Sequence, residues 1–332
     1  MTIVPNKILI IQTAFIGDVI LATALIEKIR AHLPKAQIDY LVRKGNEALV
    51  QNHPHINEVI IWDKKSDKYK NLYRLLKKIR NTKYDAIVNT QRFGATGMLT
   101  ALSRAGIRSG FSKNPFSIGF THTAAHEIGD GTHEVERNQK LISFFTDDIA
   151  AKPKLYPSNA DFDKISQYQN LPYVTISPTS VWFTKQYPAY KWVELIDRIP
   201  KNLNVFLLGG PDDKEVINQL IAKCQLNIPE NLAGQLSFLQ SAALMQNSKM
   251  NYVNDSGPLH LCSAMNAPVT SVFCSTIPDF GFTPLSDKKH IVETKNKLDC
   301  RPCGLHGHKS CPESHFECAN TIETEQLIST LE

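Results

Sequence analysis

The chain has 332 residues, of which 42% are hydrophobic and 21% are charged, and its formal net charge is +5. This is the composition of an ordinary globular protein of about two domains, which excludes a disordered chain. The apolar runs are shorter than the ~18 residues of a membrane-spanning helix, and the first residues read as a strand rather than a secretion signal. We therefore expect a cytoplasmic protein with reduced cysteines.

The charge is divided unevenly along the chain. Residues 1–160 hold 23 Lys and Arg against 14 Asp and Glu, whereas residues 161–332 hold 14 against 18. A basic half beside an acidic half indicates that the first half meets an anionic partner. An unevenly charged, solvated surface explains the same numbers, and the sequence leaves both interpretations open.

Strand-like and helix-like segments alternate in the first half. The hydrophobic pattern predicts a helix over 18–32 and strands at 8–11, 37–43, 59–62 and 84–90. Residues 122–138 read as a loop leading to a helix over 134–145. Two prolines in 147–162 indicate a boundary that separates domains 1–160 and 161–332.

The second half repeats this alternation. It predicts strands at 173–178, 204–211 and 269–274, helices at 190–199 and 214–224, and a strand, turn and helix within 250–268. Alternating elements form right-handed βαβ units with parallel sheets. We predict an α/β protein with two Rossmann-like, doubly wound domains that face each other across a cleft. The prediction also allows the last helix to pack back on the first domain.

Loops that follow parallel strands are where such folds bind ligands. In residues 254–260, Asp255 ends a strand and Ser256-Gly257 begin a helix with Pro258 at an early position. The free N–H groups of such a helix start suit a diphosphate. Simple capping by Asp255 or Ser256 is the alternative.

Two further loops carry weaker signals. Gly209-Gly210 follows a strand but is more typical of a turn than of a phosphate cradle, and Asp213 is our preferred partner for ribose hydroxyls. Lys185 lies beside aromatic residues and could neutralise a leaving phosphate. An ordinary surface lysine is the alternative.

Asp18 follows Gly17 where the first strand turns into a helix. As a helix cap it would contribute ~1 kcal/mol, and as a general base it would contribute ~10²–10⁴ in rate. A capped carboxylate has a lowered pKa and is a poor base. The residues by themselves favour the cap.

Four stretches of the sequence, taken together, change this assessment of Asp18. KILIIQTAFIGDVILATALI, FTKQYPAYKWVEL, LLGGPDDKE and NDSGPLHLCSAMNAPVTSVF together resemble the heptosyltransferases of glycosyltransferase family 9, over about residues 6–320. The resemblance implies a GT-B fold and metal-independent, inverting transfer of a heptose or related sugar. The implied donor is an ADP-activated sugar, and the implied acceptor is a lipopolysaccharide core or similar anionic glycolipid.

The resemblance also assigns residues. It makes Asp18 the general base and Lys185 a ligand of donor phosphate. It also places Asp255, Ser256, Gly257 and His260 at the donor site. To these the loops after the strands add Thr179, Gly209, Gly210 and Asp213. Independently of the resemblance, we predict an acceptor site of Thr13 and Gly17 in the first loop and of Arg92 and Arg108, which can pair with carboxylates or phosphates. Ala14-Phe15, and the residues after the strand at 269–274, depart from the family pattern, which leaves the exact donor and acceptor open.

Metal and membrane contacts are secondary predictions. A structural zinc site at Cys300, Cys303, Cys311 and Cys318 fits the ligand types but only part of the spacing, so packed or redox-sensitive thiols are favoured. Asp161-Phe162-Asp163 reads as a helix start rather than a metal motif.

Residues 64–83 hold nine Lys and Arg and one Asp around an apolar stripe. They predict a surface helix, with peripheral contact to an anionic membrane as the alternative.

Three other classes of protein remain as alternatives. A catalytically inactive GT-B scaffold would bind nucleotide without transfer. A nicotinamide-dependent oxidoreductase would need a Gly-rich fingerprint after the first strand, and TAFIGD holds one glycine. A nucleic-acid-binding module is disfavoured because the cations gather on one amphipathic helix.

Overall fold

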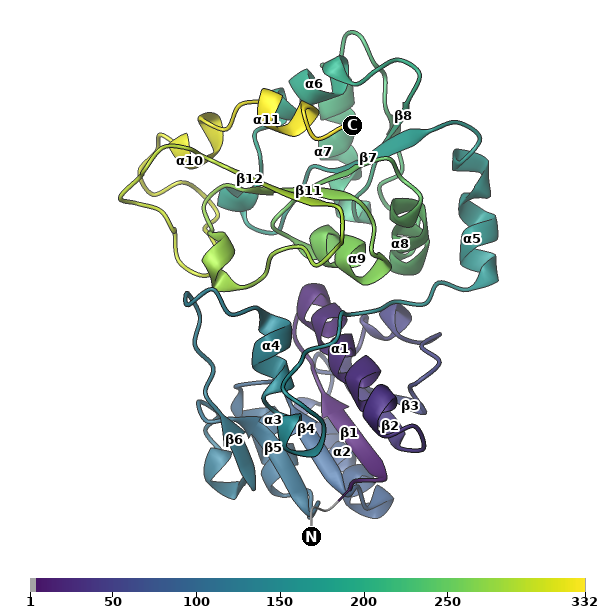
Figure 1. Cartoon of the computed structure of the whole chain (residues 1–332), viewed down its shortest axis with the longest axis vertical. Coiled ribbons are helices and arrows are strands. Elements are labelled where there is room, and N and C mark those ends of the chain that lie inside the picture. Colours follow the sequence, from purple (N-terminus) through teal and green to yellow (C-terminus); the bar gives the residue numbers. More distant parts are fainter. Residues whose placement is uncertain (1–3, 332) are drawn as a thin grey trace. The chain divides into compact units, whose positions relative to one another are not determined.

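The computed structural model describes residues 4–331, and the chain divides into two compact units, Met1–Tyr156 and Pro157–Glu332. Each unit is a parallel six-stranded sheet with helices packed against it (Figure 1). This confirms the predicted α/β class with doubly wound sheets, because βαβ crossovers place helices over the faces of a parallel sheet.

The first unit has the strand order β3-β2-β1-β4-β5-β6. Its strands are β1 Lys7–Ile11, β2 Gln37–Arg43, β3 Glu58–Trp62, β4 Ala86–Asn89, β5 Ile107–Phe111 and β6 His122–Ala124. Its helices are α1 Ile16–His32, α2 Lys68–Thr82, α3 Gly94–Ala101 and α4 Glu134–Gln139. Leu72 and Leu76 of α2 pack with Leu9, Ile11 and Ile87 of the central strands, which fixes this helix on the sheet.

The second unit has the order β12-β11-β10-β7-β8-β9. Its strands are β7 Tyr173–Ser177, β8 Asn204–Leu207, β9 Glu230–Asn231, β10 Asn251–Asn254, β11 Val269–Phe273 and β12 Lys289–Glu293. Its helices are α5 Asn159–Ile165, α6 Ala189–Arg198, α7 Lys214–Ile221, α8 Phe238–Gln246, α9 Gly257–Met265, α10 Glu317–Asn320 and α11 Glu325–Ile328. The last helix, α11, contacts α6 within this unit.

Both sheets reverse their strand order at one point. Successive strands run outward from β1 in one direction and from β4 in the other, and β7 and β10 are related in the same way. Loops after neighbouring strands diverge at such a point and leave a crevice at the carboxyl ends, where ligands bind. The loops after β1, β4, β7 and β10 are therefore the ones that matter for function.

Several elements differ from the sequence prediction. The structure adds β5 and α3, whose mixed residues show no clear period; β5 contains Arg108 and Gly110. The predicted loop 122–138 contains the short edge strand β6, and α4 ends at Gln139 instead of continuing to residue 145. The predicted helix start at Asp161 is confirmed, because Ser158 and Asp161 form the capping box of α5.

We also searched the helices for membrane spans. Within residues 4–331, every helix falls short of the length and apolarity that crossing a bilayer requires.

Candidate active site

Asp18 is the third residue of α1, just beyond the carboxyl end of β1. Phe15 is the N-cap residue and its side chain forms no capping bond. The Asp18 carboxyl instead accepts from the backbone amides of Phe15 and Asp18, so it keeps part of the capping role. Burial of the Asp18 carboxyl and the negative charge of Glu134 raise its pKa to about 6. The backbone amides of Asp18 and Phe15 and the charge of Arg92 lower this pKa, but by less. The carboxylate is thus poised to take up a proton near neutral pH.

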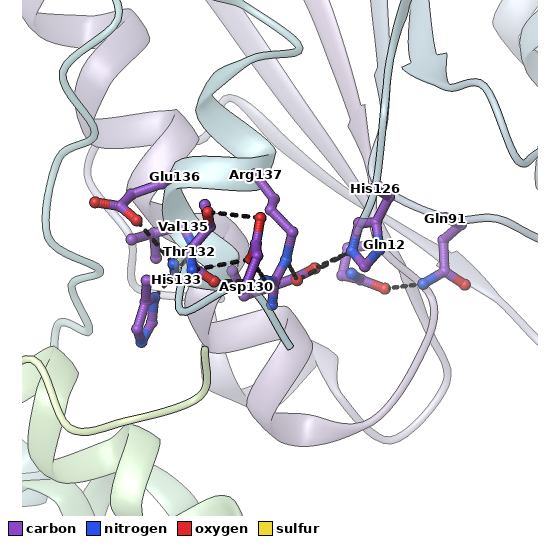
Figure 2. A network of polar contacts seen from close by, with 10 residues as sticks. Gln12, Gln91, His126, Asp130, Thr132, His133, Val135, Glu136 and Arg137 are labelled. Carbon is purple, nitrogen blue, oxygen red and sulfur yellow. Dashed lines mark hydrogen bonds and ion pairs between the residues drawn. The ribbon is translucent and has the colours of Figure 1, made fainter. Parts of the chain in front are cut away.

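Two residues labelled in Figure 2, His126 and Arg137, hold the buried Glu134 carboxylate in place. His126 Nε2 lies 3.1 Å from Glu134 Oε2, and Arg137 Nε donates to the same oxygen at 2.8 Å. Burial opposes ionisation of Glu134, but the hydrogen bonds and charges of His126 and Arg137 outweigh it and hold the pKa of Glu134 low. Glu134 therefore stays ionised and keeps its effect on Asp18.

Three cations follow the strands on either side of Asp18. Arg92 follows β4, Arg43 ends β2 and lies 5.5 Å over the Phe15 ring, and Lys64 follows β3. The Lys64 ammonium donates to the backbone oxygen of Thr13 at 2.7 Å and to its hydroxyl at 3.0 Å. Burial, together with the nearby cations, lowers the pKa of Lys64. The edge of the sheet beside Asp18 is therefore positively charged.

The predicted acceptor residues separate into two groups. Gly17, Arg92 and Thr13 lie at the carboxyl edge of the sheet, where Thr13 is buried and its hydroxyl donates to Gln91 Oε1 at 3.4 Å. Arg108 does not join them. Its guanidinium donates to the backbone oxygens of Gly119 and Ala105, near the start of β5.

The raised pKa of Asp18 has a consequence for stability. The folded state holds this proton up to about pH 6, whereas the unfolded carboxyl loses it near 3.8. The carboxylate therefore destabilises the fold as pH rises through this window, and the penalty persists above it. We expect Asp18→Asn to raise Tm by a few degrees at pH 8 and to leave it unchanged at pH 3.5. Calorimetry at the two pH values checks this, and a variant that is less stable at pH 8 would contradict it.

In the second unit, Lys185 and Asp255 form a buried ion pair. Lys185 Nζ lies 2.6 Å from Asp255 Oδ2, and the Thr276 hydroxyl donates to the same oxygen at 2.6 Å. Lys185 comes from the loop after β7 and Asp255 from the loop after β10, so the strand reversal brings them together. The surface-lysine interpretation of Lys185 is wrong, because only 14% of its side chain is exposed.

Asn254 connects these two loops. Its Oδ1 accepts from the Tyr187 amide at 2.9 Å, and its Nδ2 donates to the Pro178 oxygen at 2.9 Å. Thr179 lies next to this contact. The side chain at the end of β10 thus fixes the loop that carries Lys185.

The start of α9 has the geometry that the sequence predicts. Ser256 is the N-cap in extended conformation, Gly257 is the first helical residue, and Pro258 follows. The Ser256 side chain forms no capping bond, so the capping explanation is wrong for this residue. The amide groups of this turn are directed out of the helix, as an anion requires. His260 lies buried in the same first turns.

The Gly209-Gly210 loop is a tight turn. The Gly210 amide donates to Asp213 Oδ2 at 2.7 Å, so one oxygen of Asp213 closes the turn. A Cβ atom at Gly209 would lie 2.9 Å from the Asp213 Cβ, which explains why glycine is needed there. The turn follows β8, next to β7 in the sheet.

The cysteine-rich segment supports the Lys185 loop. The His308 amide donates to the Thr184 hydroxyl at 2.8 Å, and Arg301 Nε donates to the Cys274 oxygen at 2.8 Å. Cys300 Sγ lies 3.9 Å from His315 Nε2. Across residues 4–331, His, Cys, Asp and Glu side chains are not grouped in threes that could hold a metal ion.

Sequence reasoning missed several of these groups. His126 sits in a predicted loop, and Glu134 lies at the start of a predicted helix without a predicted role. Lys64 belongs to a charge run that predicts a surface helix or a membrane contact. Thr276 lies where the sequence departs from the family pattern. Their positions depend on contacts between distant segments, which a local pattern cannot reveal.

Two doubly wound sheets of this kind are the architecture of the GT-B fold. The model of glycosyltransferase family 9 (heptosyltransferase) matches residues 72–313, and the chain belongs to this family. The protein is therefore a glycosyltransferase, and the oxidoreductase alternative is wrong.

Relatives agree over most of the chain. Lipopolysaccharide heptosyltransferase 3 of Escherichia coli is 29% identical over 286 residues, which is 79% of this chain and 82% of that protein. The glycosyltransferase family 9 structure from Veillonella parvula has a TM-score of 0.86 at 20% identity, covering 98% of this chain and 96% of that one. The ADP-heptose LPS heptosyltransferase II of E. coli has a TM-score of 0.79 at 22% identity, covering 98% and 97%.

Proposed function

We propose that the protein transfers a heptose, with inversion, from an ADP-activated donor to a lipopolysaccharide core or similar anionic glycolipid, with Asp18 as the general base. The observation that carries the proposal is the partly buried Asp18 carboxyl at the strand reversal of the first sheet, whose pKa is influenced by the charges of Glu134 and Arg92. The printed names of its relatives, lipopolysaccharide heptosyltransferase 3 and ADP-heptose LPS heptosyltransferase II, support the choice of donor and acceptor.

In this proposal the reaction is a single displacement. The acceptor hydroxyl oxygen attacks the anomeric carbon while the bond from that carbon to the diphosphate oxygen breaks. Asp18 removes the hydroxyl proton as the new bond forms. ADP leaves from the opposite face, which inverts the anomeric carbon.

The second unit would hold the donor. Lys185, oriented by Asp255 and Thr276, would neutralise the charge that develops on the diphosphate. The amide groups at Ser256 and Gly257 would bind the phosphates. The remaining donor contacts that we propose are from Thr179, Gly209, Gly210, Asp213 and His260.

The first unit would bind the acceptor. Arg92 and Arg43 would pair with its carboxylates or phosphates through two parallel hydrogen bonds, and Lys64 would pair with them as a single positive charge. Thr13 and Gly17 would shape the floor of the site. We leave Arg108 out of this assignment, since its guanidinium is committed to backbone oxygens. Residues 64–83 would allow peripheral contact with a membrane that holds the acceptor.

The test is transfer from ADP-heptose to a lipid A acceptor that carries Kdo, followed by mass spectrometry and by NMR of the new anomeric centre. We expect a product one heptose heavier with inverted configuration, and little turnover with a UDP-sugar. ADP-heptose binding without transfer would favour the inactive scaffold, and a retained configuration would contradict the single displacement.

A further inference from the structure

Three exposed apolar side chains of the first unit lie on segments that contact each other, and we call them the apolar tip. It consists of Phe93, Phe116 and Ile118, whose exposed fractions are 64%, 39% and 100%. Phe93 precedes α3, and the other two lie in the loop between β5 and β6. Apolar side chains gathered on a surface mark a site of contact with a partner or a membrane.

The loop that carries the tip is held firmly. Asn114 is buried, and its Nδ2 donates to the Gln91 oxygen at 2.9 Å while its Oδ1 accepts from the Phe116 amide at 2.9 Å. A Cβ atom at Gly97 would lie 1.9 Å from Asn114 Oδ1, so α3 has glycine where the loop packs on it. The tip is therefore a fixed part of the surface, and its exposure does not come from loose packing.

The sequence segment that contains the tip is strongly basic. Residues 68–126 contain eleven Lys and Arg and a single Asp, a net charge of +10 in a chain whose total is +5. Helix α2 buries its leucines and exposes most of its cations, together with Tyr69 and Tyr73 at 80% and 68%. Because α2 contacts α3 and α3 contacts the turn at Ser117–Gly119, the helix and the tip adjoin the same helix, α3.

We propose that the apolar tip and the outer side of α2 dock on an anionic lipid bilayer, an inference that rests on the proposed glycolipid acceptor. Phe116 and Ile118 enter the acyl region, the tyrosines lie at the interface, and the cations meet anionic headgroups. A protein partner fits less well, because protein interfaces are depleted in lysine.

This docking also serves the site. Asn114 links the tip to Gln91, and the Gln91 side chain contacts Thr13 beside Asp18. A glycolipid whose acyl chains stay in the bilayer would then present its headgroup sugars at the carboxyl edge of the sheet. Docking at the tip and delivery of the acceptor are one event in this proposal.

The experiment is co-flotation of the full chain with phosphatidylcholine vesicles, with and without phosphatidylglycerol. We expect binding only to the anionic vesicles and release at high salt. Ile118→Asp and the triple variant Lys70→Glu, Arg74→Glu, Lys77→Glu should each weaken partitioning by about tenfold or more. Ile228→Asp, an equally polar change at a 73% exposed site of the second unit, is the matched control and should bind like the wild type.

A second readout detects insertion directly. Ile118→Trp in a Trp182→Phe background should show blue-shifted emission on anionic vesicles, whereas Trp182→Phe alone should not, since the remaining Trp62 and Trp192 are buried. Wild-type partitioning by Ile118→Asp, or binding to neutral vesicles alone, would overturn the proposal. The proposal would also be overturned if the wild type does not bind vesicles but self-associates, and Ile118→Asp abolishes that self-association.

Transfer to a deacylated acceptor separates this inference from the proposed function. If docking fails while transfer to that soluble acceptor persists, only the docking is wrong. If vesicles bind but heptose is not transferred, only the proposed function is wrong. Ile118→Asp should leave transfer to the soluble acceptor unchanged and lower transfer to vesicle-embedded acceptor by about tenfold.

Discussion

Asp18→Asn lowers kcat by about 100-fold or more and leaves the Kd for ADP-heptose nearly unchanged. The side chain keeps its size, but it can no longer accept the proton of the attacking hydroxyl. The donor residues of the second unit are untouched by the change. Steady-state kinetics with calorimetric titration of the donor checks both parts of the expectation.

The matched control is Asp148→Asn, which removes the same charge from an exposed position of the same unit. It should keep wild-type kinetics. Turnover by Asp18→Asn within a few fold of the wild type would remove Asp18 from the mechanism. A large loss of donor affinity would instead indicate a distorted fold.

Lys185→Gln lowers kcat/KM for the donor by about 100-fold, because the diphosphate loses its preorganised counter-charge. It also destabilises the second unit, since Asp255 is left buried without its cation, at a cost of about 3 kcal/mol. Kinetics and thermal unfolding measure these two effects separately.

A double-mutant cycle distinguishes the structural part from the chemical part. Adding Asp255→Asn to Lys185→Gln should recover most of the lost stability and none of the lost activity. Lys214→Gln, at an exposed position, is the control and should change neither. A double variant that regains donor turnover would show that Lys185 acts only by compensating Asp255.

The sequence predicts the regular parts of this molecule well, for a physical reason. Buried central strands such as β1 and β4 are largely apolar, and α6 has a clear helical period, so the local sequence indicates that these elements are buried on one or both sides. Strand β5 is also buried, but Arg108 and Gly110 interrupt its pattern. Edge strands β6 and β12 bury little and leave almost no signal.

The site is predictable only where one segment carries the chemistry. Asp18 and the start of α9 follow strands directly, so the loop pattern finds them. The pairing of Lys185 with Asp255 joins residues 70 positions apart, and it follows from strand order, which the sequence does not state. Glu134 raises the pKa of Asp18 from a separate helix, and only the folded structure brings the two charges close.

The pH dependence of kcat/KM tests the role of Asp18 most directly, with a phosphate-free acceptor fragment so that the substrate does not titrate in the same range. We expect kcat/KM to fall tenfold for each pH unit below about 6, the pKa of the Asp18 carboxyl, and to be level above it. Arg92→Gln should move the acidic limb of the pH profile to higher pH, because it removes a cation that lowers the pKa of Asp18. A limb near pH 4, or a profile that Arg92→Gln leaves in place, would contradict the assignment of Asp18 as the base.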